Sequence, residues 1–162
     1  GYFETDIGVT LKELIYDLAG GIKDRKNFKA ALLGGAAGTF VPESFLDVGM
    51  AFESLQEKDA VLGSGAIIVM AEDKSILDML KSILRFFEHE SCGKCVPCRV
   101  GTKHLVGILD MIASGLGTPK DLDMLEHLGK NGRFEKTMGK IDGEDVADDD
   151  RSLFLGIEFD WR

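Results

Sequence analysis

Three cysteines, with two residues between each neighbouring pair, constrain this sequence more than any other feature. Cys92, Cys95 and Cys98 are all the cysteines of the chain, and they lie in residues 90–101, between two segments with helical patterns. Thiolates hold the iron of iron–sulfur clusters, and this spacing lets three sulfurs converge on one face of a cluster. The spacing therefore favours an iron–sulfur site over other uses of the cysteines.

The residues among the cysteines suit such a site. Gly93 allows the main chain to come close to inorganic sulfide without a side chain in the way. Pro97 stiffens the turn. The positive charges of Lys94 and Arg99 can offset the negative charge of a thiolate-bound cluster.

Two other uses of the three cysteines remain open. A Cys-x-x-Cys pair can be redox-active with the third thiol beside it, and three cysteines can bind zinc together with a distant histidine. A tetrahedral zinc ion and a cubane cluster each need a fourth ligand, and the sequence contains no fourth cysteine. The fourth ligand is the main open question that the sequence raises.

Composition excludes several classes of protein. With 44% hydrophobic and 29% charged residues, the chain is typical of a globular protein. A net charge of −9 argues against nucleic acid as a partner, because phosphate binding needs clustered lysine and arginine. No apolar run reaches membrane-spanning length, the N-terminus lacks a signal pattern, and the cysteines do not form a secreted disulfide framework. We therefore expect a cytoplasmic protein, or one at the cytoplasmic membrane face of a complex, without direct membrane insertion.

The first part of the chain has the pattern of a small α+β unit, with one helix packed on a sheet. Residues 2–8 are compatible with an edge strand. Thr10 and Glu13 form the Thr-x-x-Glu capping box of a helix. Strands are predicted over residues 28–33 and 66–70. The glycines are expected to serve turns and close packing, because no phosphate-binding glycine pattern opens a helix here.

The second part has helical patterns. Apolar residues recur at helical spacing over 76–87 and again over 105–112, on either side of the cysteines. Thr118 is placed to cap a third helix, with Pro119 at its first position and Asp121 in its first turn. This part is therefore predicted to be a helical bundle with the cysteines at one end.

The predicted domain boundaries follow these changes of pattern. Residues 1–72 form the α+β unit and residues 73–140 the helical, iron–sulfur-binding unit. Residues 141–162 form a tail of uncertain structure. That tail begins with an acidic run and ends with apolar and aromatic residues, a composition that fits either a partner-binding peptide or an end that packs on its own domain.

Several segments resemble the flavin-bearing, NADH-oxidising subunit of respiratory complex I, and the same module of NAD-linked hydrogenases and formate dehydrogenases. They are residues 10–15 (TLKELI), 63–70 (GSGAIIVM), 85–102 (RFFEHESCGKCVPCRVGT) and 117–123 (GTPKDLD). The likeness extends from the start of the chain to about residue 128, and the cysteine pattern is highly specific.

The resemblance implies an α+β protein, in which a ubiquitin-like β-grasp (SLBB) domain precedes a four-helix domain that holds one [4Fe–4S] cluster. In that family the cluster takes electrons from reduced FMN and hands them on. The family's flavin- and NADH-binding domain, which precedes the β-grasp domain, is missing from this sequence. FMN and NAD are therefore expected on a missing domain or partner, in a multi-subunit redox complex. A fragment or split subunit of this kind is not expected to be an active NADH dehydrogenase alone.

The resemblance also bears on the fourth cluster ligand. The family's fourth cysteine corresponds to a place near residues 137–139, where Met138 stands. A thioether is an uncharged and weaker donor than a thiolate, so Met138 is a poor ligand for cluster iron. His127, Asp142 or Asp148 can substitute, the site can hold a three-iron cluster, or one iron can stay open to water or to a ligand from a partner. The identity of the fourth ligand stays open.

Two functional hypotheses result. In the first, Cys92, Cys95 and Cys98 bind an iron–sulfur cluster in an electron-transfer module of an NAD-linked oxidoreductase. Hydrogen bonds or charge from Ser91, Gly93 and Lys94 then tune its potential. In the second, the cluster is degenerate or lost and the scaffold serves as a non-redox assembly or interaction module. A Cys95→Ala variant discriminates them, because only the first predicts a loss of colour and of cluster.

Overall fold

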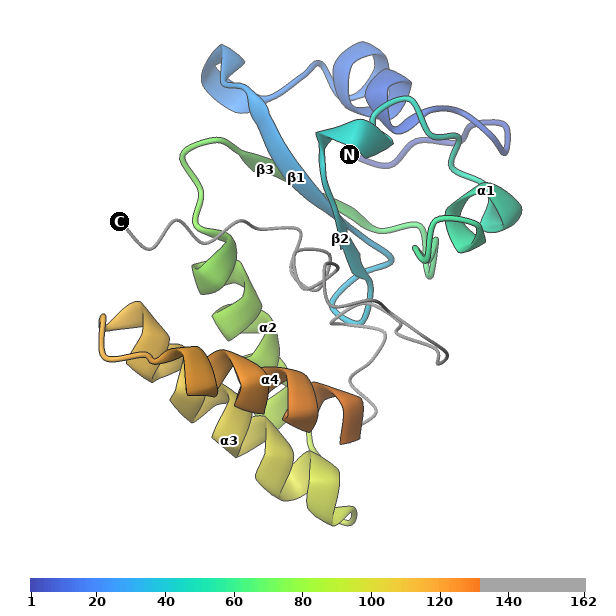
Figure 1. Cartoon of the computed structure of the whole chain (residues 1–162). Coiled ribbons are helices and arrows are strands. Elements are labelled where there is room, and N and C mark those ends of the chain that lie inside the picture. The colour runs from blue at the N-terminus through green and yellow to red at the C-terminus, as the bar shows by residue number, and fades with distance from the viewer. Residues whose placement is uncertain (132–162) are drawn as a thin grey trace. The chain divides into compact units, whose positions relative to one another are not determined.

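The computed structural model describes residues 1–131 (Figure 1). The chain divides into two compact units, the first formed by Gly1–Lys74 and the second beginning at Ser75. The first contains a small antiparallel sheet, and the second contains helices. This order of a sheet followed by a helical region confirms the predicted α+β fold class.

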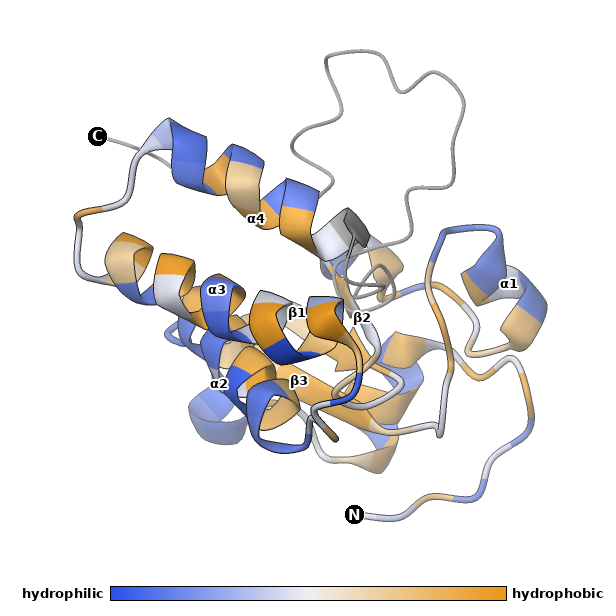
Figure 2. Cartoon of the chain, turned by 90° about the horizontal axis from the view of Figure 1, so that it is seen from below, coloured by the Kyte–Doolittle hydropathy of each residue, from blue (hydrophilic) through white to orange (hydrophobic). Residues whose placement is uncertain are grey.

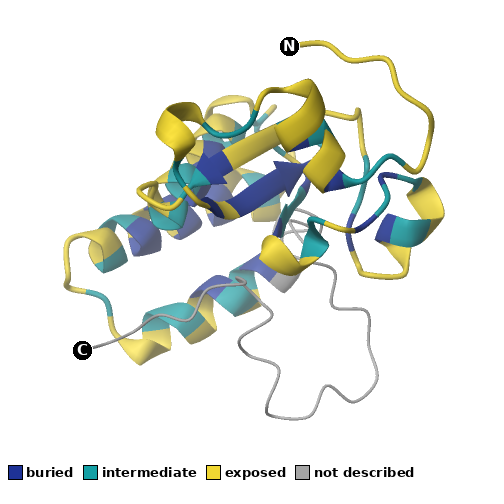
Figure 3. Ribbon diagram, turned by 90° about the horizontal axis from the view of Figure 1, so that it is seen from above, coloured by how far each residue is buried: buried dark blue, intermediate teal, exposed yellow. Residues whose placement is uncertain are grey.

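The sheet has three strands in the order β2-β1-β3, with β1 in the centre (Figure 1). β1 (Phe28–Leu33) pairs antiparallel with β2 (Thr39–Val41) and with β3 (Ile67–Ala71), so that Leu32 lies between Phe40 and Ile68. β1 is almost entirely buried (Figure 3), as expected for a central strand of aliphatic residues. The strands predicted over 28–33 and 66–70 are therefore confirmed, whereas β2 was not predicted.

The helix predicted from Thr10 is present, with a π-helical course over Glu13–Leu18. Its capping box is formed as expected, because the Thr10 N–H donates to the Glu13 carboxylate over 2.8 Å and the Glu13 N–H donates to Thr10 Oγ1 over 3.2 Å. The Thr10 N–H and the Thr10 hydroxyl, which both donate to the Glu13 carboxylate, hold the pKa of Glu13 below its ordinary value. Leu11 and Ile15 of this segment are buried in one apolar cluster with Ala31 and Leu33 of the sheet.

The edge strand predicted over residues 2–8 is wrong. These residues form no strand and all are exposed, and the nearest sheet-like feature is a single antiparallel bridge between Thr10 and Gly49. A short segment of mixed polar and apolar residues does not form a strand unless a neighbouring strand offers it a register. The short helix α1 (Phe52–Gln56), which contributes the fully buried Leu55, was not predicted.

The second unit contains α2 (Ile76–His89), α3 (Val96–Ala113) and α4 (Pro119–Asn131). Each predicted apolar stripe supplies buried residues, and the sequence along α4 alternates between hydrophilic and hydrophobic (Figure 2). The start of α4 is as predicted, since the N–H and Oγ1 of Thr118 both donate to the Asp121 carboxylate over 2.7 Å. The buried apolar residues are Leu80, Ile83, Leu84, Leu105, Val106, Ile108, Leu109 and Leu125.

The described helices set a limit on membrane topology. The longest, α3, has 18 residues. Within residues 1–131, none of the helices combines the length and the apolar character needed to cross a membrane.

Candidate metal centre

The three cysteines lie where α2 gives way to α3. α2 ends at His89, and Cys95 occupies the N-cap position of α3, with Pro97 in the first turn of that helix. Cys92 therefore lies in the connecting loop, and Cys98 lies in the first helical turn. The N-terminus of a helix favours negative charge, because its main-chain N–H groups and dipole point toward it. This position suits side chains that act as thiolates.

The cysteines are free thiols with unequal exposure. Cys92 and Cys95 are exposed, and Cys98 is half-buried. Among residues 1–131, no three His, Cys, Asp or Glu side chains are grouped so that they could hold a metal ion, so the three sulfurs do not form a converged set. The assignment of Cys92, Cys95 and Cys98 as metal ligands stays a prediction.

Ser91 links the loop to the first turn of α3. Its Oγ lies 3.3 Å from Cys98 Sγ and accepts the Gly93 N–H over 3.3 Å. On the other side of the same glycine, the Arg99 guanidinium donates to the Gly93 carbonyl over 2.8 Å. Lys94, also expected to lie near the sulfurs, is exposed and makes no hydrogen bond or ion pair with the described residues.

Gly93 is required by the backbone conformation of the loop. Its φ is +75°, in the left-handed region that favours glycine, and a Cβ built at this position would meet no heavy atom within 4 Å. The loop is thus open on that side. The only buried polar residue among those described, Thr102, lies one turn beyond Cys98 and donates its hydroxyl to the Cys98 carbonyl over 2.7 Å.

The donor chemistry of this segment fits an iron–sulfur cluster in part. It supplies three free thiols, two of them exposed, at a helix N-terminus and around a glycine with open space beside it. A fourth protein ligand is not identified within residues 1–131. Asp142 and Asp148, named as alternatives, and Met138, expected to be a poor ligand, lie outside the described residues.

The three histidines do not join the cysteines in a metal-binding group within the described part of the chain. His89 is exposed, with Nδ1 3.2 Å from a Glu90 carboxylate oxygen, and His104 on α3 is exposed as well. His127 on α4 is also exposed. The exposure of His89 and His104 is that of surface residues, and His127 stays an untested ligand.

An ion-pair cluster joins α2 to the last turns of α3. Asp110 pairs with Lys81 and, at 3.3 Å, with Arg85, both on α2. The hydrogen bond from Lys81, with a contribution from Arg85, holds the pKa of Asp110 below its ordinary value. The cluster supports the pairing of the two helices that flank the cysteines.

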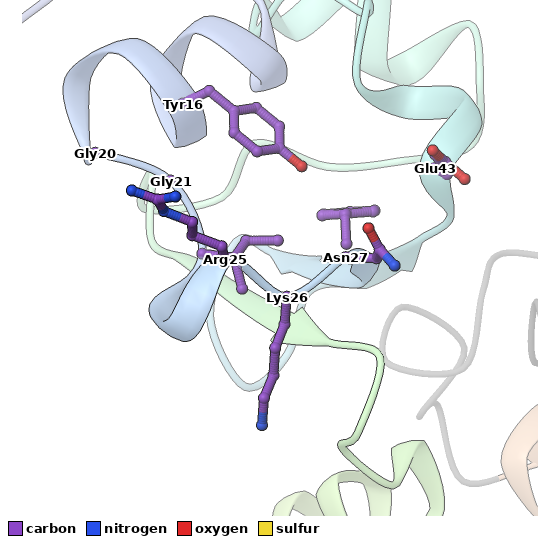
Figure 4. Close-up of a pocket in the computed structure, with 9 residues that line it drawn as sticks. Tyr16, Gly20, Gly21, Arg25, Lys26, Asn27 and Glu43 are labelled. Atoms are coloured by element: carbon purple, nitrogen blue, oxygen red, sulfur yellow. The ribbon is translucent and has the colours of Figure 1, made fainter.

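A cavity of about 670 Å³ lies in the sheet unit, between the π-helical segment and the start of β1 (Figure 4). Tyr16 and Glu43 lie on opposite sides of it, and Lys26 at its rim pairs with Asp73 at 2.7 Å. No pattern in the sequence marks this cavity, because its lining comes from separate segments. Because none of the cysteines lines this cavity, it is not part of the candidate metal centre, which is the segment between α2 and α3.

Comparisons with known proteins agree on one group. A family model described as the NADH-ubiquinone oxidoreductase-F iron-sulfur binding region matches residues 78–137. The NADP-reducing hydrogenase subunit HndC of Solidesulfovibrio fructosivorans is 43% identical over 130 residues, which cover 80% of this chain and 26% of that protein. The F subunit of the NADH-quinone oxidoreductase of Escherichia coli (strain K12) is 37% identical over 128 residues, which cover 79% of this chain and 29% of the relative.

Solved structures give the same result. The NAD⁺-reducing [NiFe]-hydrogenase in the H₂-reduced state matches with a TM-score of 0.69 and 28% identity, over 85% of this chain and 24% of the matched one. The air-oxidised state matches with a TM-score of 0.67 and 30% identity, over 80% of this chain and 22% of the matched one. The HndC protein and the Escherichia coli F subunit are both much longer than this chain, which spans between a quarter and a third of their length.

Proposed function

We propose a function for this chain on the premise that it is homologous to the C-terminal region of the NADH-quinone oxidoreductase-F and HndC proteins, the 4Fe–4S binding region included. The proposed function is that of an iron–sulfur electron-transfer module in an NAD-linked oxidoreductase. The observation that carries the proposal is the position of Cys92, Cys95 and Cys98, three free thiols at the N-terminus of α3, inside the matched region.

In this proposal the three thiolates hold a [4Fe–4S] cluster, which would accept and pass on single electrons. Ser91 Oγ lies 3.3 Å from Cys98 Sγ, and a hydrogen bond from that hydroxyl to the thiolate would raise the potential of a cluster. Lys94 and Arg99 add positive charge around the sulfurs, which favours the reduced, more negative form. Gly93 keeps the loop free of side-chain bulk on its open side.

The electrons are proposed to come from a flavin on another domain or subunit. The relatives are named as subunits of quinone- and hydrogenase-type complexes that use NADH, NAD⁺ or NADP. By analogy, FMN and NAD belong to the rest of such an assembly, and this chain passes electrons from that flavin to further clusters. Its partners are then other subunits of a multi-subunit redox complex, on the cytoplasmic side of the membrane.

The first experiment measures metal. The chain is purified and reconstituted without oxygen, assayed for iron, acid-labile sulfide and zinc, and studied by EPR after dithionite reduction. We expect a brown protein with iron and sulfide in near-equal amounts and an EPR signal from a reduced cluster. Zinc at one equivalent, with neither iron nor sulfide, would contradict the proposal.

Variants assign the ligands. Cys92→Ala, Cys95→Ala and Cys98→Ala are each expected to lose most of the bound iron, because each removes one of few protein ligands. Ser114→Ala, at the other end of α3, is the control; its hydroxyl binds the Asp110 and Met111 carbonyls and is expected to leave iron content unchanged. His127→Ala, tested beside them, asks whether α4 supplies the fourth ligand.

The competing function is a non-redox assembly module on the same scaffold. It predicts that Cys95→Ala changes neither the colour, nor the folding, nor the partner binding of the chain. A cysteine series with no effect on metal content would therefore replace the electron-transfer proposal with this one.

A further inference from the structure

The main chain of Gly93 is held on both sides by side chains of the cysteine segment. Its N–H donates to Ser91 Oγ over 3.3 Å, and its carbonyl accepts from the Arg99 guanidinium over 2.8 Å. Gly93 lies between Cys92 and Cys95, so the two contacts act on the part of the loop that carries Cys92.

Both contacts lead to the first turn of α3. Arg99 belongs to that turn, where its own N–H donates to the Cys95 carbonyl over 2.9 Å. Ser91 Oγ also lies 3.3 Å from the sulfur of Cys98, the residue before Arg99. Two adjacent residues of the helix are thus linked to the loop, one through its sulfur and one through its guanidinium.

We propose that Arg99 is a positioning residue that, with Ser91, fixes the Cys92 loop on the first turn of α3. The proposal rests on the proposed cluster only for its metal readout. Arg99 acts here through the Gly93 carbonyl, and this is a different role from the general positive charge that Lys94 supplies. Fixing the loop sets the position of Cys92 relative to Cys95 and Cys98 before any metal binds, which lowers the conformational cost of bringing the three sulfurs together.

Replacing arginine by lysine at position 99 separates the effect of hydrogen-bond geometry from the effect of charge. Arginine presents a planar fork of donors with a fixed geometry, whereas lysine is a flexible point charge. Arg99→Lys keeps the charge and loses that geometry. Lys103→Ala removes one positive charge from the next turn of α3, at an exposed residue that makes no hydrogen bond or ion pair with the described residues. It is the matched control.

The first readout needs no metal. In the metal-free chain under reducing conditions, amide exchange over residues 91–95 is measured by NMR or mass spectrometry. Hydrogen bonds to charged groups are worth enough that losing one speeds local opening by about tenfold. We expect that increase in Arg99→Lys and Arg99→Gln, a similar one in Ser91→Ala, and less than about a twofold change in Lys103→Ala.

The second readout is the release of iron to a chelator from the reconstituted chain. Faster release is expected in Arg99→Lys and Arg99→Gln, in proportion to the change in exchange, and not in Lys103→Ala. If Arg99→Lys exchanges and releases iron as the wild type does, while Arg99→Gln and Lys103→Ala both do so faster, Arg99 acts by charge and the proposal is overturned. Unchanged exchange in every Arg99 variant overturns it as well.

The two proposals can fail separately. If the wild-type chain takes up no iron or sulfide, the electron-transfer function is wrong, and the exchange experiment still decides the role of Arg99. If the wild type binds a cluster and the Arg99 variants neither exchange nor release iron faster, the function stands and the positioning role is wrong. Circular dichroism of each variant verifies that α3 is still folded.

Discussion

Glycine has different roles in the two units of the chain. In the turn between β1 and β2, a Cβ on Gly38 would lie 1.6 Å from the Leu33 carbonyl oxygen. Gly63, which precedes β3, comes close to the same turn, so that a Cβ on it would lie 2.7 Å from Gly34 Cα. Between α2 and α3, a Cβ on Gly93 would touch nothing, and glycine is required there only by a φ of +75°. In the first region glycine is needed because a Cβ has no room, and in the second because the backbone has a positive φ.

The difference indicates what each region is built for. Main-chain segments that approach as closely as those around Gly38 leave no room for a ligand, so these glycines close the end of the sheet. Gly93 belongs instead to the segment that carries three free thiols, and a Cβ there would meet no heavy atom within 4 Å. Several glycines in a row are therefore not by themselves a sign of a binding loop, because the turn at Gly38 has no room for a Cβ, whereas the cysteine segment, with its single glycine among the cysteines, does.

Gly38→Ala is expected to have the largest effect. Because the obstructing atom belongs to the main chain and not to a flexible side chain, the turn must change shape, at a cost of about 4 kcal/mol or more in unfolding free energy. Denaturant unfolding measures the loss, and hydrogen exchange locates it in residues 28–41. Gly107→Ala is the control, since that helical glycine has open space beside its Cβ position and should gain about 0.5–1 kcal/mol. Equal effects of the two variants would contradict the space argument.

Leu105→Ala and Leu55→Ala compare the cores of the two units. Both leucines are fully buried, so each truncation is expected to cost about 2–5 kcal/mol through lost burial and a cavity. Leu105 lies on α3, two turns beyond Cys98, whereas Leu55 lies on α1 in the sheet unit. Iron content after reconstitution should therefore fall in Leu105→Ala and stay unchanged in Leu55→Ala. A loss of iron in both variants would mean that the metal centre depends on the sheet unit.

Gly93→Ala is expected to cost less than either core change. The left-handed conformation disfavours alanine by about 1–2 kcal/mol, with no added clash. Gly93→Asn should recover part of that cost, because asparagine tolerates this conformation better than alanine. The measurement is amide exchange over residues 90–96, together with global unfolding. A loss in Gly93→Ala as large as that in Gly38→Ala would show that the loop is crowded and would remove the contrast between the regions.

The parts of the fold that could be predicted from the sequence are those specified locally. Thr10 with Glu13, and Thr118 with Asp121, start helices through contacts three residues apart, so the pattern alone identifies them. β2 and the absence of a strand over residues 2–8 depend on which segments pair across the sheet. Pairing partners come from distant parts of the chain, and a three-residue strand ending before Pro42 carries too weak a pattern to be recognised.

The candidate site divides in the same way. Its three thiols were predictable because they lie within seven residues of one another and share a recognisable spacing. The contact of Arg99 with the Gly93 carbonyl was not predicted, since it depends on how the loop folds back on the helix. The fourth ligand was not predictable for a related reason, because a residue that completes a metal site from another segment leaves no local spacing pattern.

Asp110→Asn and Asp73→Asn give the smallest expected effects and compare the ion pairs of the two units. Lys81, assisted by Arg85, lowers the pKa of Asp110, and Lys26 lowers that of Asp73. A carboxyl with a lowered folded-state pKa binds fewer protons folded than unfolded, so its stabilising effect is present near neutral pH. That effect is lost as the pH falls through the folded-state pKa, below about pH 4.

Each of these variants should therefore unfold at a slightly lower temperature than the wild type at pH 7, and the difference should vanish at the acid end of a pH series. Both pairs are solvent-exposed and screened by salt, so the effect should be smaller than that of Gly93→Ala and should shrink in high salt. Hydrogen exchange separates the units, because Asp110→Asn should act on α2 and α3 and Asp73→Asn on the sheet. Asp123→Asn is the control, because Asp123 makes no ion pair with the described residues. A difference that persists unchanged at low pH would mean that Asp110 stabilises the helices through packing and not through its charge.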